Sequence, residues 1–466
     1  MSTTTMISAT QCGVEFDAAA AVSALAAADR FGEYVMYERP GEWVFAADPI
    51  GSVELDAHEL RITWAGRSTT RAWEGSPAAS GLGRHSPASV VEQALAGLPL
   101  AGRNAYGWIG FEFCAWSLGS TEHLPARTSL AHVMIPRIEV RIDASGVRVS
   151  GATPRETADI HELIVAGRAT DPGRAHPVDT TLDPTGYRDR VAGAVEEIRN
   201  GLYQKVILSR RVELPFPVDV PSTYRLGRAH NTPARSFLLR LGGLEAAGFS
   251  PELVVAVDAD RMVTTEPLAG TRAFGRGAEA DRAARSELVG DPKEIVEHAI
   301  SVRTSFAEID AVAAPGSTAV TDFMAVRERG SVQHLASTVR GRLDAGRTSW
   351  EALEMLFPSV TASGIPKRAG VDAVFRLDHD PRGLYSGAVL AISPRGALEA
   401  TLVLRAVYQT AEGAWLRAGA GIVAQSTPDR EFEETCEKLS SIAPYVVKAR
   451  TDLRTTGGLG AKPASE

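Results

Sequence analysis

The sequence predicts an α+β fold with much antiparallel sheet. Strand-like runs alternate with turns from about residue 31 to 150, and strands mix with helical segments in the rest of the chain. Hydrophobic residues make up 44% of the 466 residues and charged residues 23%, which is typical of a globular protein with a sizeable core. The length allows about two to four domains or one large unit.

The first residues carry no targeting signal. Residues 1–16 lack a basic segment and a long apolar run, so we interpret them as a flexible N-terminus rather than a signal peptide. Asp17 can cap a short apolar helix over residues 17–29. This helix is too short to span a bilayer, so we expect no association with a membrane.

The N-terminal part of the fold is predicted at residues 17–165 and consists mainly of strands. It ends in a hairpin over residues 138–151, with the turn at Ala144-Ser145-Gly146. The other predicted strands are 34–38, 41–47, 52–56, 60–66 and 106–113.

A polar segment at residues 166–186 separates this part from the next. It is rich in Pro, Gly, Asp and Thr, so we predict a surface linker. A helix follows over residues 187–201, where Tyr187, Val191 and Val195 recur at helical spacing.

Strands and helices mix in the second part, residues 187–448. Residues 449–466 after it are polar, and we expect them to form a disordered tail. Beyond the first helix, the predicted strands are 203–216, 236–241, 252–258, 262–268, 384–392, 399–410 and 415–423, and the predicted helices are 218–231 (after a turn), 291–309 and 428–447.

The charge and cysteine content argue against several classes of function. The net charge is −8 and Lys and Arg are scattered, so we expect no nucleic-acid partner. An anionic substrate would have to be attracted by local cations or a metal ion. The cysteines Cys12, Cys114 and Cys436 include no C-x-x-C pair, which indicates a reducing, cytoplasmic setting without a disulfide framework.

Two predicted helices carry glutamates at the same spacing. Glu294 and Glu297 lie in one, and Glu431 and Glu434 in the other; each pair is i, i+3, so both carboxylates project from one side. Lys438 falls on the same side of the second helix as Glu431. Taken alone, each pair is better explained by a solvated helix face, because this spacing is common on helices. If the four carboxylates instead converge in a cleft, Mg²⁺ would supply the counter-charge, because it prefers oxygen ligands.

Several longer stretches identify a family. Residues 184–447 resemble the chorismate-utilising enzymes, namely the anthranilate, aminodeoxychorismate, isochorismate and salicylate synthases. The matching stretches, in family order, are YQKVILSR, SPELVV, TEPLAGTRAFG, KEIVEH, RGSVQHLASTV, FPSVTASGIPK, PRGLYSGAV, LRAGAGIV and EFEETCEKL. The N-terminal third, at YVMYE, GEWVFAAD and YGWIGFEF, resembles the salicylate synthases of mycobactin siderophore biosynthesis.

The resemblance implies a single large α+β fold with two packed antiparallel sheets and helices outside. It implies an Mg²⁺-dependent enzyme that converts chorismate to isochorismate, adding water at C2 and losing hydroxide from C4, and then eliminates pyruvate to leave salicylate. Residues 187–448 would be its chorismate-binding catalytic part. We expect a monomer without a glutaminase subunit.

The catalytic roles follow from the same resemblance. Isochorismate formation needs a base on one side of the ring and an acid on the other. Lys205 matches the family's base, and a desolvated lysine gives up its proton more readily. Glu252 matches the general acid, which needs a raised pKa. Without the resemblance, an exposed strand lysine and a surface glutamate would be the simpler interpretations.

The resemblance also assigns ligand contacts. Glu297 and Glu434 match direct Mg²⁺ ligands, and Glu431 and Glu294 match positions that bind directly or through water. Arg405 matches the arginine that holds the enolpyruvyl carboxylate, where its planar fork suits two oxygens. The remaining expected substrate contacts are Tyr385, Gly270, Thr271, Gly419, Ala420, Gly421, Lys438 and His334, the last of which could equally be a packed core histidine.

Two residues argue against amination by this chain. Anthranilate synthases carry Gln where Lys205 stands, and aminodeoxychorismate synthases carry a nucleophilic Lys where Ala269 stands. Water is the remaining nucleophile. An isochorismate synthase that stops at the first product stays open, whereas the presence of Lys205 and Glu252 argues against a chorismate- or metal-binding protein without turnover. A serine hydrolase is disfavoured, because GLYSG is not a nucleophile elbow.

Overall fold

The computed structural model describes residues 5–8, 17–28, 30–73, 85–125, 127–330 and 332–450. The predicted tail lies outside these residues apart from its first two positions. The strands are β1 (Thr5–Ser8), β2 (Tyr34–Arg39), β3 (Glu42–Asp56), β4 (Glu59–Trp64), β5 (Arg67–Ala72), β6 (Ala105–Ile109), β7 (Ser129–Asp143), β8 (Gly146–Ser150), β9 (Lys205–Leu214), β10 (Arg235–Leu241), β11 (Leu244–Ser250), β12 (Leu253–Val257), β13 (Met262–Thr265), β14 (Leu268–Ala273), β15 (Ala319–Arg329), β16 (Val332–Arg342), β17 (Gly364–Ile365), β18 (Ala388–Ile392), β19 (Leu398–Leu402), β20 (Ala406–Thr410) and β21 (Gly413–Ile422). The α-helices are α1 (Ala18–Ala27), α2 (Pro87–Ala96), α3 (Ala115–Leu118), α4 (Pro154–Ala169), α5 (Tyr187–Arg199), α6 (Val220–Ala229), α7 (Ala278–Gly290), α8 (Pro292–Asp310), α9 (Ser349–Leu356), α10 (Lys367–Leu377) and α11 (Pro428–Leu439). Short 3₁₀ helices are η2 (Phe111–Cys114), η3 (Thr121–His123), η4 (Val360–Ala362) and η5 (Ala443–Tyr445).

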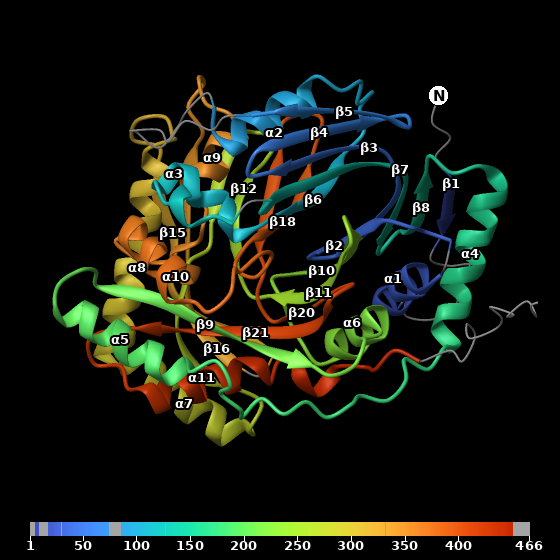
Figure 1. Ribbon diagram of the computed structural model, residues 1–466. Helices are drawn as coiled ribbons and strands as arrows, with labels where there is room; N and C mark the ends of the chain where they lie inside the picture. Colours follow the sequence, from blue (N-terminus) through green and yellow to red (C-terminus); the bar gives the residue numbers. More distant parts are fainter. Residues whose placement is uncertain are drawn as a thin grey trace, which may run out of the picture.

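The strands confirm the predicted α+β class with an antiparallel sheet. All strand pairings given for the described residues are antiparallel and form one connected network. One path through it runs β9–β21–β20–β11–β10–β2–β3, and it continues β7–β6–β18–β19–β12–β13–β16. The helices lie around the outside of these strands (Figure 1).

The two long strands β3 and β7 join the two halves of the network. The first half of β3 pairs with β2 and its second half with β4, while β7 accompanies both halves. Their register shifts between Pro49 and Gly51, next to Asp48 in the left-handed region at φ 53°. This bulge lets one strand contribute to both sheets. The two predicted sheets are therefore hydrogen-bonded to each other, and the predicted strands 41–47 and 52–56 are one strand.

Strands of the N-terminal part are inserted among those of the rest of the chain. Strand β2 pairs with β10, and β6 pairs with β18. The predicted hairpin at residues 138–151 is present as β7 and β8. β1 pairs with β8, so residues 5–8 of the predicted flexible N-terminus form a strand.

Three predicted elements are corrected. The strand predicted at 106–113 ends at Ile109, and residues 111–114 turn into η2, where the Glu112 carboxylate accepts the backbone N–H of Arg382. The helix predicted at 428–447 ends at Leu439, and the chain continues through the short 3₁₀ helix η5; Pro444 has no N–H for a hydrogen bond to the carbonyl four residues earlier, so one α-helix cannot run unbroken through it.

The strand predicted at 399–410 is broken at Arg405. This residue adopts φ 52°, and the backbone resumes as β20 only at Ala406. A left-handed residue cannot continue a strand, so the chain turns here. Helix α4 was not predicted. Its capping box, Thr153 with Glu156, fixes its start, and its last residues, 166–169, fall in the segment predicted as a linker.

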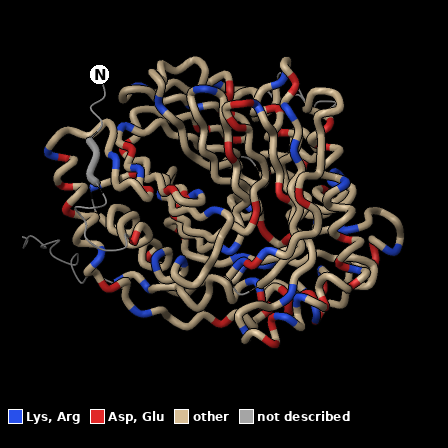
Figure 2. The backbone as a smooth tube through the Cα atoms, turned by 180° about the vertical axis from the view of Figure 1, so that it is seen from behind, with Lys and Arg blue, Asp and Glu red and all other residues tan. Residues whose placement is uncertain are grey.

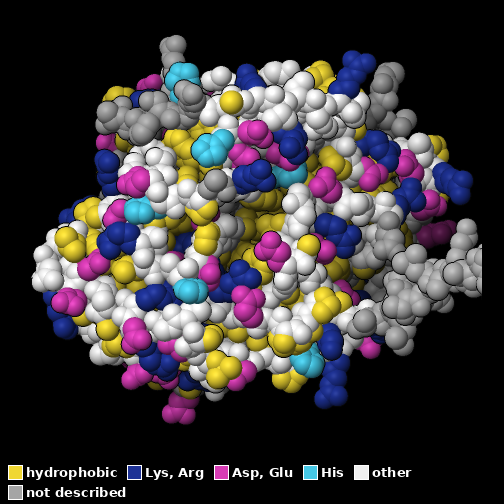
Figure 3. Space-filling view, in the orientation of Figure 1, with side chains coloured by type: hydrophobic (Ala, Val, Ile, Leu, Met, Phe, Trp, Pro, Cys, Tyr) yellow, Lys and Arg dark blue, Asp and Glu magenta, His cyan; other side chains and the backbone are white. Residues whose placement is uncertain are grey.

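The surface carries mixed charge. Lys and Arg are interspersed with Asp and Glu along the backbone (Figure 2). The face in Figure 3 is hollowed near its centre, with apolar side chains inside and charged ones around the opening. Among the described helices, none combines the length and apolarity needed to cross a bilayer.

Candidate active site

A cavity of about 470 Å³ gathers side chains from distant segments of the chain. Strands β9, β14, β16 and β21, helices α8 and α11, and the Arg405 turn all contribute to its wall. Every predicted site residue except Ala420 lines it. Because side chains alternate along β21, Gly419 and Gly421 face the cavity while Ala420 is buried in the core. Ile207, Leu268 and Leu404 supply apolar surface.

Lys205 is buried, with only 5% of its surface exposed. It is the first residue of β9 and shares one face of that strand with Ile207. Its Nζ donates to Glu297 Oε1 at 2.5 Å. Burial by itself would raise the pKa of Glu297, but the Lys205 ammonium holds it below its ordinary value. A Cβ at Gly421 would lie 3.0 Å from the Lys205 Cε, so glycine there leaves room for the lysine.

Glu252 directly precedes β12 and is 1% exposed. Its Oε1 accepts hydrogen bonds from Ser359 Oγ at 2.6 Å and Thr361 Oγ1 at 2.7 Å. Its Oε2 has no partner among the described residues. Burial raises the pKa of Glu252 to about 7, against the effect of the two hydroxyl donors. A substantial fraction of the Glu252 side chains therefore holds a proton near neutral pH, as a general acid must.

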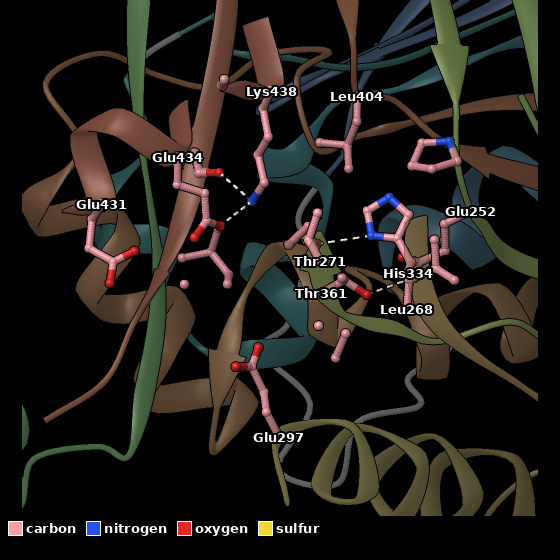
Figure 4. Close-up of a pocket in the computed structure, with 18 of the residues that line it drawn as sticks. Glu252, Leu268, Thr271, Glu297, His334, Thr361, Leu404, Glu431, Glu434 and Lys438 are labelled. Atoms are coloured by element: carbon pink, nitrogen blue, oxygen red, sulfur yellow. Dashed lines mark hydrogen bonds and ion pairs between the residues drawn. The ribbon is translucent and has the colours of Figure 1, made fainter. Parts of the chain in front are cut away.

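The glutamates of α11 point into the same cavity (Figure 4). Lys438 Nζ lies 2.8 Å from Glu434 Oε1 and donates to the Gly419 carbonyl at 2.9 Å. Burial alone would raise the pKa of Glu434, but Lys438 holds it below its ordinary value. Burial raises the pKa of Glu431, which lies one turn earlier. In Figure 4 both glutamates lie on the opposite side of the pocket from Glu252.

Glu294 completes the acidic set from α8. Arg272 on β14 donates to Glu294 Oε1 at 2.9 Å and also to Glu287 and Asp291, so it holds the start of α8 against β14. Burial raises the pKa of Glu294, against the effect of Arg272. Gly270 allows the close approach: its φ is +80°, and a Cβ there would lie 3.0 Å from Glu294 Oε2.

The donor chemistry of these four glutamates fits a hard divalent cation such as Mg²⁺. Two helices present carboxylate oxygens to one cavity, and Mg²⁺ binds through one or two carboxylates plus water. Three of the four glutamates have a cationic partner in this structure. Lys205 binds Glu297, Lys438 binds Glu434 and Arg272 binds Glu294. Within the described residues, the one group of three or more His, Cys, Asp or Glu residues whose ligand atoms all lie within 4.8 Å of one another is elsewhere, at Glu122, His123 and Asp372.

Arg405 is a buried cation without a carboxylate partner. No Asp or Glu of the described residues lies within 4.0 Å of its guanidinium, which donates to the Arg329 carbonyl at 3.1 Å and to His334 Nε2 at 2.7 Å. Burial lowers the pKa of Arg405 to about 10, with Arg329 acting in the same direction. An uncompensated guanidinium in a cavity wall is suited to an anionic ligand.

His334 holds Arg405 in place. Arginine can only donate, so His334 Nε2 must accept, and the ring proton lies on Nδ1, which is 3.0 Å from Thr271 Oγ1. Burial, followed by Arg405, lowers the pKa of His334 well below its ordinary value, consistent with a neutral ring. The contacts between these side chains support a role in positioning Arg405 within the wall.

Tyr385 approaches the cavity from the turn before β18. Its hydroxyl has no hydrogen-bond partner among the described residues, and burial raises its pKa. Arg417 lies behind the ring, 5.5 Å from its centroid, and is bound to the buried carboxylate of Asp378. A Cβ at Gly419 would lie 2.9 Å from the Tyr385 hydroxyl, so this glycine keeps the hydroxyl accessible.

Sequence reasoning missed four residues of the site. Ser359 and Thr361 bind Glu252, Arg272 binds Glu294, and Lys293 lines the cavity from the first turn of α8. Ser359 and Thr361 lie in the stretch FPSVTASGIPK, which matched the family, but no charge marked them as functional. Arg272 directly follows the glycine and threonine that were assigned.

A family comparison covers most of the chain. The model of the chorismate binding enzymes matches residues 33–444. The chain belongs to this family. Among the chorismate binding enzymes, a salicylate synthase of Mycolicibacterium paratuberculosis is 53% identical over 430 residues, covering 92% of this chain and 93% of that protein. An anthranilate synthase component 1 of Halobacterium salinarum is 36% identical, covering 61% of this chain and 55% of that protein.

Solved chorismate binding enzymes share the fold. The menaquinone-specific isochorismate synthase of Escherichia coli aligns with a TM-score of 0.70 at 18% identity, covering 96% of this chain and 94% of that one. Anthranilate synthase component I of Streptococcus pneumoniae aligns with a TM-score of 0.67 at 23% identity, covering 88% and 92%.

Proposed function

We propose that this protein is an Mg²⁺-dependent salicylate synthase that converts chorismate to isochorismate and then to salicylate and pyruvate. The geometric observation that supports it is an acid and a base in one cavity: Glu252 with a raised pKa and a free oxygen, and buried Lys205. The choice of salicylate synthase within the family follows the relative that is 53% identical over almost its whole length.

The first step exchanges a hydroxyl group. In its neutral amine form, Lys205 takes a proton from water as the water oxygen bonds to C2, the ring double bonds shift, and Glu252 gives its proton to the hydroxyl leaving C4 as water. Arg405 and Tyr385 hold the enolpyruvyl carboxylate, and Lys438 adds positive charge beside the acidic helices.

Glu297 and Glu434, with Glu431 and Glu294, would hold Mg²⁺ next to the ring carboxylate. When bound, the ion supplies positive charge that lets this carboxylate enter an acidic cavity. The second step needs no acid or base, only the right conformer of the bound isochorismate. In this step hydrogen moves from C2 to the enolpyruvyl methylene as the C3–O bond breaks. The apolar side chains Ile207, Leu268 and Leu404 can pack against the ring and limit its conformers.

A product assay tests the proposal. The protein is incubated with chorismate, with and without Mg²⁺, and the products are separated. Salicylate with pyruvate, formed only with Mg²⁺, supports the proposal. Isochorismate alone identifies an isochorismate synthase, and an aromatic amine formed with ammonia would contradict water as the nucleophile.

A substitution tests the assignment of Lys205 as the general base. We expect Lys205→Ala to abolish isochorismate formation, whereas Lys448→Ala, at an exposed position near the end of the described chain, leaves it unchanged. Near-normal activity of Lys205→Ala would show that another group is the base.

The proposal has four further parts: cytoplasmic location, a monomeric state, a role in siderophore synthesis and the absence of a glutaminase subunit.

A further inference from the structure

We propose that Ser359 and Thr361 are positioning residues that hold the Glu252 carboxyl group in a fixed orientation through its Oε1. The inference deepens the proposed function, on which its catalytic consequence rests. It starts from an asymmetry: one carboxyl oxygen has two hydroxyl donors and the other has no partner among the described residues.

The hydroxyl groups are held in place by their own backbone. Ser359 is the N-cap of η4, and its Oγ accepts the Thr361 N–H at 3.3 Å. A hydroxyl that accepts from an N–H keeps its single hydrogen for donation, and Glu252 Oε1 lies 2.6 Å away. Thr361 follows within the same short helix and reaches the same oxygen.

Two donors on one oxygen decide where the proton of the neutral acid lies. A protonated carboxyl has one carbonyl oxygen, which accepts, and one hydroxyl oxygen, which donates. When both hydroxyls donate to Oε1, that oxygen is the carbonyl oxygen of the neutral acid. The proton is then on Oε2, in a residue that lines the cavity (Figure 4). A general acid has to be held in a defined orientation toward the leaving group, and the two hydrogen bonds to Oε1 restrict rotation of the Glu252 carboxyl group.

The same two hydroxyls tune acidity. Burial raises the pKa of Glu252, whereas hydrogen bonds from Ser359 and Thr361 stabilise the ionised form and lower it. The other charged and titratable groups around Glu252 stay unchanged in the variants below. They are Glu266 between β13 and β14, Arg329 on β15, His334 on β16, Arg405 before β20 and Lys205 on β9.

The test uses matched hydroxyl deletions. Ser359→Ala and Thr361→Val each remove one donor to the carboxyl, and Thr361→Ser restores it. Thr401→Val is the control, because the buried Thr401 hydroxyl donates to the backbone carbonyl of Glu252 at 3.3 Å and not to its carboxyl. Two quantities are measured in each variant. One is the pH dependence of kcat/KM for isochorismate formation; the other is the titration midpoint of the Glu252 carboxyl, from infrared difference spectra against Glu252→Gln.

We expect Ser359→Ala and Thr361→Val to raise the midpoint by about one pH unit, to shift the alkaline limb of kcat/KM equally, and to lower kcat/KM about 10-fold or more. Thr361→Ser and Thr401→Val should keep the original midpoint. An unchanged midpoint in both deletions, or an equal shift in Thr401→Val, would overturn the inference. Because the infrared titration needs no turnover, a shifted midpoint without conversion of chorismate would support the hydroxyl assignment and reject the proposed function.

Discussion

Glu252 and Arg405 are buried ionisable groups that lack an opposite charge. Removing a charge from water is costly, so most buried charges are paired, as Arg417 is with Asp378. Glu252 avoids the cost by retaining its proton, whereas Arg405 remains charged and relies on a carbonyl and a neutral histidine. Both residues lower the stability of the folded protein and gain a partner when a substrate dianion binds. Their contributions to stability and to binding should therefore have opposite signs.

Glu252 should make stability depend on pH. Its pKa in the folded protein is about 7 against an ordinary value of 4.5, so the folded state holds the proton more tightly than the unfolded chain. Its contribution to the free energy of unfolding therefore decreases as pH rises from about 4.5 to about 7, by up to roughly 3 kcal/mol. We expect Glu252→Gln to be less stable than wild type at pH 4.5, or equal to it, and clearly more stable at pH 8. Urea unfolding at both pH values measures this, with the exposed Glu412→Gln as control; a constant difference between the two pH values would contradict it.

Arg405→Gln should separate binding from stability. The amide can still donate to His334 but cannot offer a charged fork to a carboxylate, so we expect the KM for chorismate to rise about 10- to 100-fold. Its melting temperature should be equal to or higher than that of wild type, because an unpaired buried charge is removed.

Arg417→Gln provides the contrast to this variant. It breaks a buried ion pair with Asp378, so we expect a loss of about 3 kcal/mol in unfolding free energy. Steady-state kinetics and thermal melts of both variants test these expectations. An Arg405→Gln protein that binds chorismate normally would refute the assignment of Arg405 as a contact to the enolpyruvyl carboxylate.

At the scale of elements, helices α8 and α11 bring the acidic side chains together. Their glutamates could be paired from sequence because i, i+3 spacing is a local property of one helix. The left-handed turn at Arg405 could not be predicted from the sequence, because the mainly apolar run around it predicts an unbroken strand. Ser359 was also out of reach: it is neutral and lies 107 residues from Glu252 along the chain, so only the tertiary fold relates them. The resemblance supplied the residue roles, and the structure supplied the partners.

Neighbouring glutamates of α11 allow a matched test of the metal prediction. Glu434 lines the cavity, whereas Glu433 faces solvent with 67% of its side chain exposed and pairs with Arg430. A ligand that binds the folded state alone raises its melting temperature. We expect Mg²⁺ to raise the melting temperature of wild type and of Glu433→Gln, and to have little effect on Glu434→Gln. Equal responses of the two variants, or no response in wild type, would exclude Glu434 as a ligand.

At the scale of the whole molecule, the strands of residues 17–165 and of residues 187–448 form one hydrogen-bonded sheet network. β2 pairs with β10 and β6 with β18, so the strands of residues 17–165 are held between strands of the second part. Separating the parts would break these ladders and expose the apolar core around them. Arg174, in the connection between the parts, is exposed and lies outside any helix or strand, and the next residue, Ala175, forms a single β-bridge with Val447.

A single cut should therefore leave the molecule intact. We expect limited trypsin cleavage after Arg174 to give two fragments that elute together in size-exclusion chromatography, and calorimetry of the uncut chain to show one cooperative transition. Fragments that separate without denaturant, or two resolved transitions, would mean that the parts fold as independent domains.

The pairing of β6 with β18 also has a consequence during synthesis. When β6 leaves the ribosome, one of its edges has no neighbour until residues 388–392 have been translated. An unpaired strand edge beside apolar side chains is prone to aggregation. At the usual speed of translation, the delay between the synthesis of β6 and that of β18 is long. The nascent chain should therefore depend on chaperones, and slow expression at low temperature should improve the yield of native enzyme.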